Sequence, residues 1–377
     1  MGSLIYFLDS SKLYLYLSTE TTDLAVAQEL TITCSDYLPT VQRNICVAPA
    51  QNTIVIIDNE NLNYLYFHIS RFAGERNIQN AFFRYILNTN DSILSNQAYN
   101  DYLYAIIKRP TTSAISSTQT TVGSTPTGTA VQTNRYYLEN TFMRSLDPDV
   151  PRIDRKIKLT LTANNSSYSY VTNQTTINLP VSFPYTDISN IQIVTDSTWS
   201  TDVSGNRSYE IASPVAYTIK DTYVSLVFDG RFVPASGTNP QAVDYTITRT
   251  IDIGLKYTMN VELSTLFVRD QNNNAIDGVL NLRTITTRHK KTGNYDISVS
   301  NRSRTPVISS FTNQVVGDNE NLLQLSNYEE EGEFVTNVLS YSDSTSLKIT
   351  SDYPTPVNIV NIEVKGKFIQ KYTSLNT

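Results

Sequence analysis

The chain has 377 residues, more than the roughly 250 to 300 at which a single hydrophobic core stops growing, so we expect two or three domains. Its 25 Tyr against 13 Gly, with abundant Thr, Ser and Asn, favour strands and polar turns, and we predict an all-β protein. The formal net charge of -6 gives no electrostatic reason for tight nucleic-acid binding.

The start of the chain is a poor signal peptide, because no basic region precedes its apolar residues and Asp9 lies among them. No run approaches the roughly 18 apolar residues that a membrane helix needs, so we expect a soluble product that is made in a cytoplasm and does not insert into a membrane. Two cysteines build no disulfide framework in a chain of this length. Cys34 and Cys46 stand in apolar, strand-like contexts, and we expect buried free thiols.

Residues 1–146 repeat a pattern of strand, polar turn and strand in the segments 3–18, 44–71 and 81–109. A spacing of roughly 40 to 50 residues is typical of propeller blades. We therefore predict a partial, propeller-like region, with a meandering sheet as the alternative. Residues 111–134 carry no charge and almost no large apolar side chain, which indicates a flexible loop.

A Pro-bounded segment after this region indicates a change of domain. Short strands separated by Asn, Asp, Gly and Pro turns predict a β-rich middle domain over 147–244, and longer strands predict a C-terminal antiparallel β domain over 245–377. We expect antiparallel β-sandwich or barrel-like folds. Near residue 297, Tyr295, Ile297 and Val299 alternate with polar residues, as in a strand with one buried face.

Residues 278–304 consist of two extended runs that flank the basic residues 288–291, which predicts a hairpin with a basic turn. His289 lies in this turn, where neighbouring cations disfavour its protonation, and we expect it to be solvated. His68 lies in a strand, and we expect a core or interface histidine. No motif pairs either histidine with a nucleophile or a metal ligand.

Three acidic patterns resemble binding or catalytic sites. Residues 270–278 resemble a calcium loop, but Ala275 stands where the turn needs Gly and Asn281 stands where a Glu should close the site, so a hairpin loop is the better interpretation. Asp147 with Asp149, or the run Glu329, Glu330, Glu331 and Glu333, could serve a glycosidase, yet we expect the run to be a solvated loop. We predict no catalytic residue, no cofactor, no metal and no enzyme activity.

Residues 253–306 resemble the C-terminal signature of tail tubular protein B, the nozzle protein family of short-tailed podophages. That family has a Gly-x-x-Tyr strand, a Leu-Ser-x-Leu-Tyr-Val-Arg-Asp strand, a loop, a Gly-x-Leu-x-Leu-Arg strand and a Thr-Gly-x-Phe/Tyr-x-Val hairpin. The matching positions are Gly254, Tyr257, Leu263, Ser264, Leu266, Val268, Arg269, Asp270, Gly278, Leu280, Leu282, Arg283, Thr292, Gly293 and Tyr295. Residues 347–372 resemble the closing strands, with Val364-Lys365-Gly366 where Trp-Glu-Gly is common, and 138–150 resembles the exit from the propeller-like domain.

The resemblance implies a homohexamer at the distal end of the tail, below a ring of tail tubular protein A and near the tail fibres. This hexamer would form the channel through which the genome leaves. An acidic chain suits a lumen that double-stranded DNA passes without specific binding, because each lumenal cation would add a contact to phosphate. The family usually has more N-terminal sequence. Three alternatives therefore stay open: a short member, a fragment, or a split member whose remaining blades come from a second chain.

Basic residues in 278–304 are the candidate interface of this acidic chain. We expect some of them to pair with carboxylates of the adjacent subunit or the adaptor ring, with a solvated loop end as the alternative. They are Arg283, Arg288, Lys290, Lys291, Arg302 and Arg304. Two other functions remain open. One is a fibre or adsorption protein that binds a surface glycan through exposed aromatics, and the other is a tail-associated polysaccharide hydrolase with two carboxylates about 5 to 10 Å apart.

Overall fold

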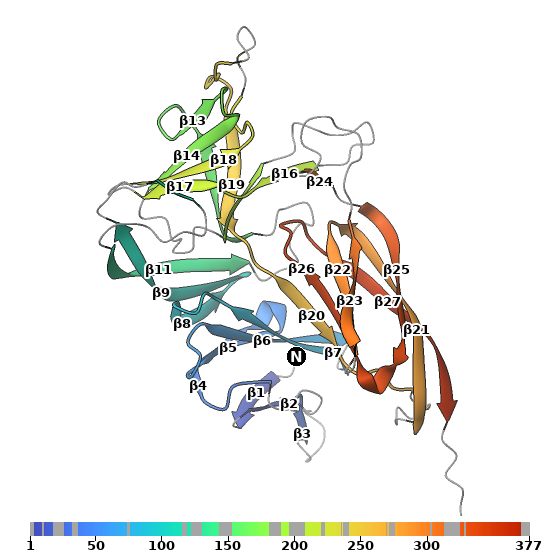
Figure 1. The fold of residues 1–377 in the computed structure, drawn as a ribbon. Helices are drawn as coiled ribbons and strands as arrows, with labels where there is room; N and C mark the ends of the chain where they lie inside the picture. The colour runs from blue at the N-terminus through green and yellow to red at the C-terminus, as the bar shows by residue number, and fades with distance from the viewer. Residues whose placement is uncertain are drawn as a thin grey trace, which may run out of the picture. The chain divides into compact units, whose positions relative to one another are not determined.

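A computed structural model gives the fold (Figure 1). Its regular elements, within the residues described, are strands and two short 3-10 turns, so the prediction of an all-β protein is confirmed. The chain divides into two compact units, unit 1 with residues 1–113 and 130–146 and unit 2 with 114–129 and 147–377. The structure describes residues 4–9, 11–17, 26–31, 37–73, 76–114, 119–121, 130–142, 153–180, 190–195, 208–219, 223–234, 236, 241–268, 270, 276–301, 304–312, 325–327 and 329–370.

The described residues of unit 1 form three antiparallel sheets. The first contains β1 (Leu4–Asp9), β2 (Lys12–Leu17) and β3 (Val26–Glu29). The second is a meander of β4 (Gln42–Ala48), β5 (Thr53–Asp58), β6 (Tyr64–Ala73) and β7 (Arg76–Ile86), with the 3-10 turn Pro49–Gln51 between its first two strands. The third has the order β11-β9-β8 and contains β8 (Ser92–Tyr99), β9 (Tyr102–Ala114) and β11 (Ala130–Phe142).

The second sheet lies between the other two, because every residue of β5 is buried. Ile54 and Ile56 pack with Leu13 of the first sheet. Val55 and Ile57, which point the opposite way along the strand, join the core that reaches the third sheet. Three antiparallel sheets stacked face to face are compatible with the predicted propeller-like arrangement.

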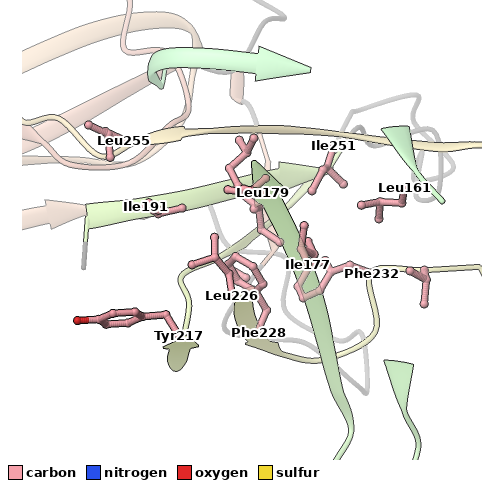
Figure 2. Packing of buried hydrophobic residues seen from close by; sticks show 14 residues of the cluster. Leu161, Ile177, Leu179, Ile191, Tyr217, Leu226, Phe228, Phe232, Ile251 and Leu255 are labelled. Atoms are coloured by element: carbon pink, nitrogen blue, oxygen red, sulfur yellow. The ribbon is translucent and has the colours of Figure 1, made fainter. Parts of the chain in front are cut away.

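The first part of unit 2 is a sandwich of two five-stranded sheets, the middle sandwich. One sheet has the order β12-β19-β15-β16-β24 and contains β12 (Asp154–Leu161), β15 (Ile191–Thr195), β16 (Ser208–Ala212), β19 (Arg249–Leu255) and β24 (Leu325–Asn327). The other has the order β10-β17-β18-β14-β13 and contains β10 (Gln119–Thr121), β13 (Ser166–Ser169), β14 (Gln174–Pro180), β17 (Ala216–Ile219) and β18 (Tyr223–Asp229). Aliphatic and aromatic side chains of both sheets meet in one core (Figure 2).

The last part of unit 2 is the C-terminal sandwich, which has a four-stranded and a three-stranded sheet. The four-stranded sheet has the order β20-β26-β22-β23 and contains β20 (Met259–Leu263), β22 (Tyr295–Asn301), β23 (Arg304–Phe311) and β26 (Thr345–Ser351), which follows the 3-10 turn Ser342–Ser344. The three-stranded sheet has the order β25-β21-β27 and contains β21 (Gly278–Thr292), β25 (Glu329–Tyr341) and β27 (Ile359–Gln370). Tyr295, Ile297 and Val299 are buried between them, as their alternation predicts.

Two sequence predictions about domains differ from the structure in detail. The start of the predicted C-terminal domain, including all of β19, lies in the middle sandwich, where Ile251 and Ile253 are fully buried between β12 and β15. In the predicted loop 111–134, the described residues lie in β9, β10 and β11. β10 pairs with β17, so this uncharged segment supplies an edge strand to the middle sandwich.

Candidate functional site

The predicted basic hairpin is wrong, because residues 278–292 form the single long strand β21. Its backbone pairs with β25 on one side and with β27 on the other, and these partners hold Arg288, His289 and Lys290 in the strand. The turn comes later, at Gly293 and Asn294, after which β22 continues in the opposite sheet. A Cβ on Gly293 would overlap Thr355, so only glycine allows this close approach. Leu282 points into the core, and the partly buried Leu280 packs against the same cluster.

The acidic run 329–333 is part of strand β25, so the prediction of a solvated loop is also wrong. The register places Glu333 directly opposite Arg288 and Glu331 directly opposite Lys290. Opposite charges at facing positions favour this strand pair modestly, whereas like charges there would oppose it.

Arg288 is held by two carboxylates of its own sheet. Its Nε lies 2.8 Å from Glu333 Oε1, and one of its terminal nitrogens lies 3.8 Å from Glu363 Oε2 on β27. About half of the Arg288 side chain is exposed, so solvent screens these ion pairs and each contributes little to stability. The outer face of the three-stranded sheet is therefore a ladder of alternating charge rather than a bare basic patch.

The structure does not bring all the predicted basic residues together. Arg283 is the extra residue of a β-bulge in β21 and is exposed. Lys291 precedes the turn with a positive φ of 49°, and its carbonyl accepts a hydrogen bond from Asn358. Arg304 begins β23 in the other sheet, opposite Asn301. Arg302 lies outside the residues that the structure describes.

Not all of these cations are neutralised within the described part of the chain. Arg283 and Arg304 are both exposed, and no carboxylate described by the structure lies within 4.0 Å of either guanidinium. Their charges are therefore available to a group outside this chain, whereas that of Arg288 is already compensated.

His289 is buried in the C-terminal sandwich, so the prediction of a solvated turn residue is wrong. Its side chain is 1% exposed, and its Nδ1 lies 3.0 Å from the hydroxyl of Tyr295, which also lies 2.7 Å from Thr287 Oγ1. The imidazole packs on Phe311 at 4.5 Å between ring centroids. The alternation of Ile285, Thr287 and His289 along β21 is the sequence signal that indicates this inward face.

His68 is fully buried, which confirms the prediction of a core histidine. It packs against Phe82 with 4.6 Å between ring centroids, and its Nε2 lies 3.5 Å from Ser70 Oγ. Cys46 is a buried free thiol, also as predicted, and burial raises its pKa. Cys34, the calcium-like residues 271–275, and the pair Asp147 and Asp149 lie outside the described residues.

The described residues hold no group of three His, Cys, Asp or Glu side chains that could bind a metal ion. A search of the same residues for helices found none long and apolar enough to cross a membrane. The features that the structure does show are packed antiparallel sheets, in-register charge pairs, and histidines held by aromatic rings.

These features define the class of protein, which is an all-β protein of packed antiparallel sheets. The chain belongs to the bacteriophage nozzle protein family, whose sequence model matches residues 1–375. This agrees with the resemblance seen in residues 253–306 and extends it to nearly the whole chain. The protein is thus a structural component of a bacteriophage virion tail.

The remaining comparisons add no further relationship. No curated protein sequence matches the chain. Two similar solved structures are of the exo-β-1,3-galactanase from Phanerochaete chrysosporium. The complex with galactose is 9% identical over 97% of this chain and 95% of that chain with a TM-score of 0.14, and a variant with β-1,3-galactotriose is 10% identical over 96% and 95% with a TM-score of 0.16. TM-scores this low support no argument about fold or activity.

Proposed function

We propose that several copies of this chain, six in a ring, form the distal tail tube or nozzle of a short-tailed bacteriophage. The ring encloses the channel through which the genome leaves. The family match over residues 1–375 is the observation that carries this proposal. This role needs no catalysis. The outer face of the three-stranded sheet in the C-terminal sandwich holds ion pairs between neighbouring strands, not a nucleophile with its base.

The charge of the chain suits this role. A net charge of -6 disfavours attachment of the moving DNA, because each cation on the lumen would add a salt-dependent contact with phosphate. Packed sandwiches supply a rigid wall, since neither sheet can bend without disturbing a close-packed core. In this proposal the ring contacts a tail adaptor ring of tail tubular protein A and the tail fibres.

The basic residues of the C-terminal sandwich supply one contact in the assembly. Arg283 and Arg304 carry exposed charges without a carboxylate partner in the described chain, so we assign them to pair with carboxylates of the adjacent subunit or the adaptor ring. Charge pairs at such a rim steer association and fix its orientation more than they raise affinity. Arg288, Lys290 and Lys291 are the other described residues of the predicted interface.

A charge-reversal pair tests the contact. Arg283→Glu and Arg304→Glu should slow ring formation or docking on the adaptor ring, with a larger effect at low salt because salt screens exposed charges. Arg43→Glu, which makes the same charge change at an exposed position of β4 in unit 1, is the matched control. If both Arg283→Glu and Arg304→Glu assembled at the wild-type rate, at low and at physiological salt, this contact would be excluded.

The function itself is tested by native mass spectrometry of the purified protein, alone and with the adaptor ring. Six copies in a closed ring are expected. A trimer would favour the alternative of a fibre or adsorption protein, and a persistent monomer would contradict the proposal. The same spectrum gives the mass of each polypeptide, so an additional chain in the ring would reveal a split protein.

A further inference from the structure

The third sheet of unit 1 has an outward face that is unusual for a solvated sheet. Along β9, Leu103, Ala105 and Ile107 are buried against the second sheet. The alternate residues Tyr102 and Ile106 therefore point outward, and both are exposed. In a sheet with one face in water, the outward positions normally carry polar side chains. The outward face of β9 therefore does not have the composition of a solvated surface.

Strand β11 shows the same reversal more strongly. Tyr137 and Glu139 point inward, where both contact the fully buried Arg109 of β9. Tyr136 and Leu138 point the other way and are 65% and 72% exposed. This strand thus places a carboxylate inside and its large apolar residues outside. Unless another layer of protein covers this face, these large apolar side chains stay in contact with water.

The register extends this surface across the sheet. Tyr99 of β8 is directly opposite Tyr102, and Gln97 is directly opposite Tyr104, so these side chains share the outward face. The rings of Tyr102 and Tyr104 are 6.3 Å apart between centroids. We call this surface the tyrosine face, and it is formed by Tyr99, Tyr102, Tyr104, Ile106, Tyr136 and Leu138.

The tyrosine face carries almost no charge. Of the outward positions described on its three strands, only Lys108 is a charged residue, and the others are aromatic, aliphatic, amide or hydroxyl side chains. Enrichment in aromatic residues and depletion of charge are the composition of the buried centre of a protein interface. Tyrosine is also among the residues that most often dominate binding energy.

The exposed area fits a protein partner. The exposed fractions are 67% for Tyr99, 38% for Tyr102, 44% for Ile106, 65% for Tyr136 and 72% for Leu138. With about 150 to 250 Å² for each large side chain, they amount to on the order of 500 Å². A standard interface buries about 800 Å² on each partner, so the tyrosine face would form its apolar centre and the surrounding amides its rim.

We propose that the tyrosine face is the surface on which a second copy of this chain docks. Copies with a net charge of -6 repel one another, and they approach most easily where a surface carries no carboxylate. In a closed ring this contact joins two different surfaces of neighbouring copies, since the same surface on both would give only a dimer. The inference rests on the proposed multi-copy ring and identifies one of its faces.

Single lysine substitutions test the docking. Leu138→Lys and Tyr136→Lys place an uncompensated cation at the centre of the contact and leave the fold unchanged, because both side chains are exposed. Tyr170→Lys is the matched control, since Tyr170 is 56% exposed in the middle sandwich. Sedimentation velocity should show association at least tenfold weaker in the two tyrosine-face variants and unchanged in the control.

The outcomes separate this inference from the proposed function. Wild-type assembly by Leu138→Lys and Tyr136→Lys would overturn the docking surface and leave the ring intact. A wild-type chain that stays monomeric, even with the adaptor ring present, would overturn both. Loss of assembly in Tyr170→Lys as well would show a general effect of added lysine and would also overturn the assignment.

Tyrosine-specific chemical labelling gives a second, independent readout. Tyr136 should react quickly in the monomeric Leu138→Lys variant and slowly in the wild-type ring, whereas Tyr170 should react equally in both. Slow reaction of Tyr136 in the monomer would show that the same chain covers the face. Protection of Tyr136 in the monomer by added neutral oligosaccharide would assign the face to a glycan. Either result would overturn the docking of a second copy.

Discussion

Arg109 gives the sharpest test of how unit 1 is held together. Its side chain is completely buried, and its Nε lies 3.2 Å from Oδ2 of Asp91, which is also completely buried. A second carboxylate, Glu139 of β11, binds its terminal nitrogen and is 24% exposed. Burial lowers the pKa of Arg109, but the hydrogen bond and charge of Glu139 and the charge of Asp91 outweigh it, so the pKa is raised. The cation therefore stays charged in the core and joins β11 to β9.

Arg109→Met keeps most of the side-chain volume and removes the charge. At 3.2 Å the attraction between Arg109 and Asp91 is about 5 kcal/mol for an effective dielectric constant of about 20. Its loss removes from the core the guanidinium that the buried Asp91 faces. Removing one member of a buried pair typically costs about 3 to 5 kcal/mol, and we predict a destabilisation of this size. Glu139→Gln leaves the inner pair intact and should cost only about 1 to 2 kcal/mol.

Urea denaturation of the full chain, followed by hydrogen exchange in peptides from β9 and β11, measures these changes in unit 1. Lys108→Met is the matched control, because Lys108 precedes Arg109 in the same strand and points to the opposite face. The control should change the free energy of unfolding by less than about 0.5 kcal/mol. If Arg109→Met cost no more than Lys108→Met, the argument that a buried charge network fixes β11 would be refuted.

Three further predictions test other parts of the molecule. Gly293→Ala should destabilise unit 2 by about 1 to 3 kcal/mol, because its Cβ overlaps Thr355, and an unchanged thermal unfolding temperature would contradict this. Arg288→Glu should cost less than about 1 kcal/mol by facing Glu333 with a like charge, and the exchanged pair Arg288→Glu with Glu333→Arg should restore stability in urea denaturation. Burial raises the pKa of the Cys46 thiol, so its contribution to stability is complete below the unfolded pKa of about 8.5 and is lost as pH rises through the folded pKa. Cys46→Ala should therefore reduce the alkaline loss of stability, and equal loss in both proteins would contradict the assignment.

In the C-terminal sandwich, the sequence alone predicted the buried face of a strand better than it predicted which strands are neighbours. The alternation of Tyr295, Ile297 and Val299 reports a buried face directly, because it depends only on neighbours within one strand. The position of His289 depends instead on β25 and β27, which lie far along the chain and satisfy the backbone of β21 from both sides. Considered without those partner strands, the four adjacent polar residues 288–291 have the composition of a turn, and the sequence alone therefore predicted a turn there.

The acidic run and the basic run were recognised separately in the sequence, but their pairing was missed. Charge complementarity is the signal that could have found it, since Glu331 and Glu333 face Lys290 and Arg288 in register. The tyrosine face was missed for a different reason. The alternation in β11 shows that Tyr136 and Leu138 share a face, but only the fold shows that this face points outward.

We propose that this tail protein forms a ring around the path of the genome. Symmetry-averaged electron microscopy of tails that contain this chain tests it most directly. Six copies around an open channel, coaxial with the adaptor ring, are predicted. A trimer at the tail periphery, or a copy of the chain outside the DNA path, would contradict the account.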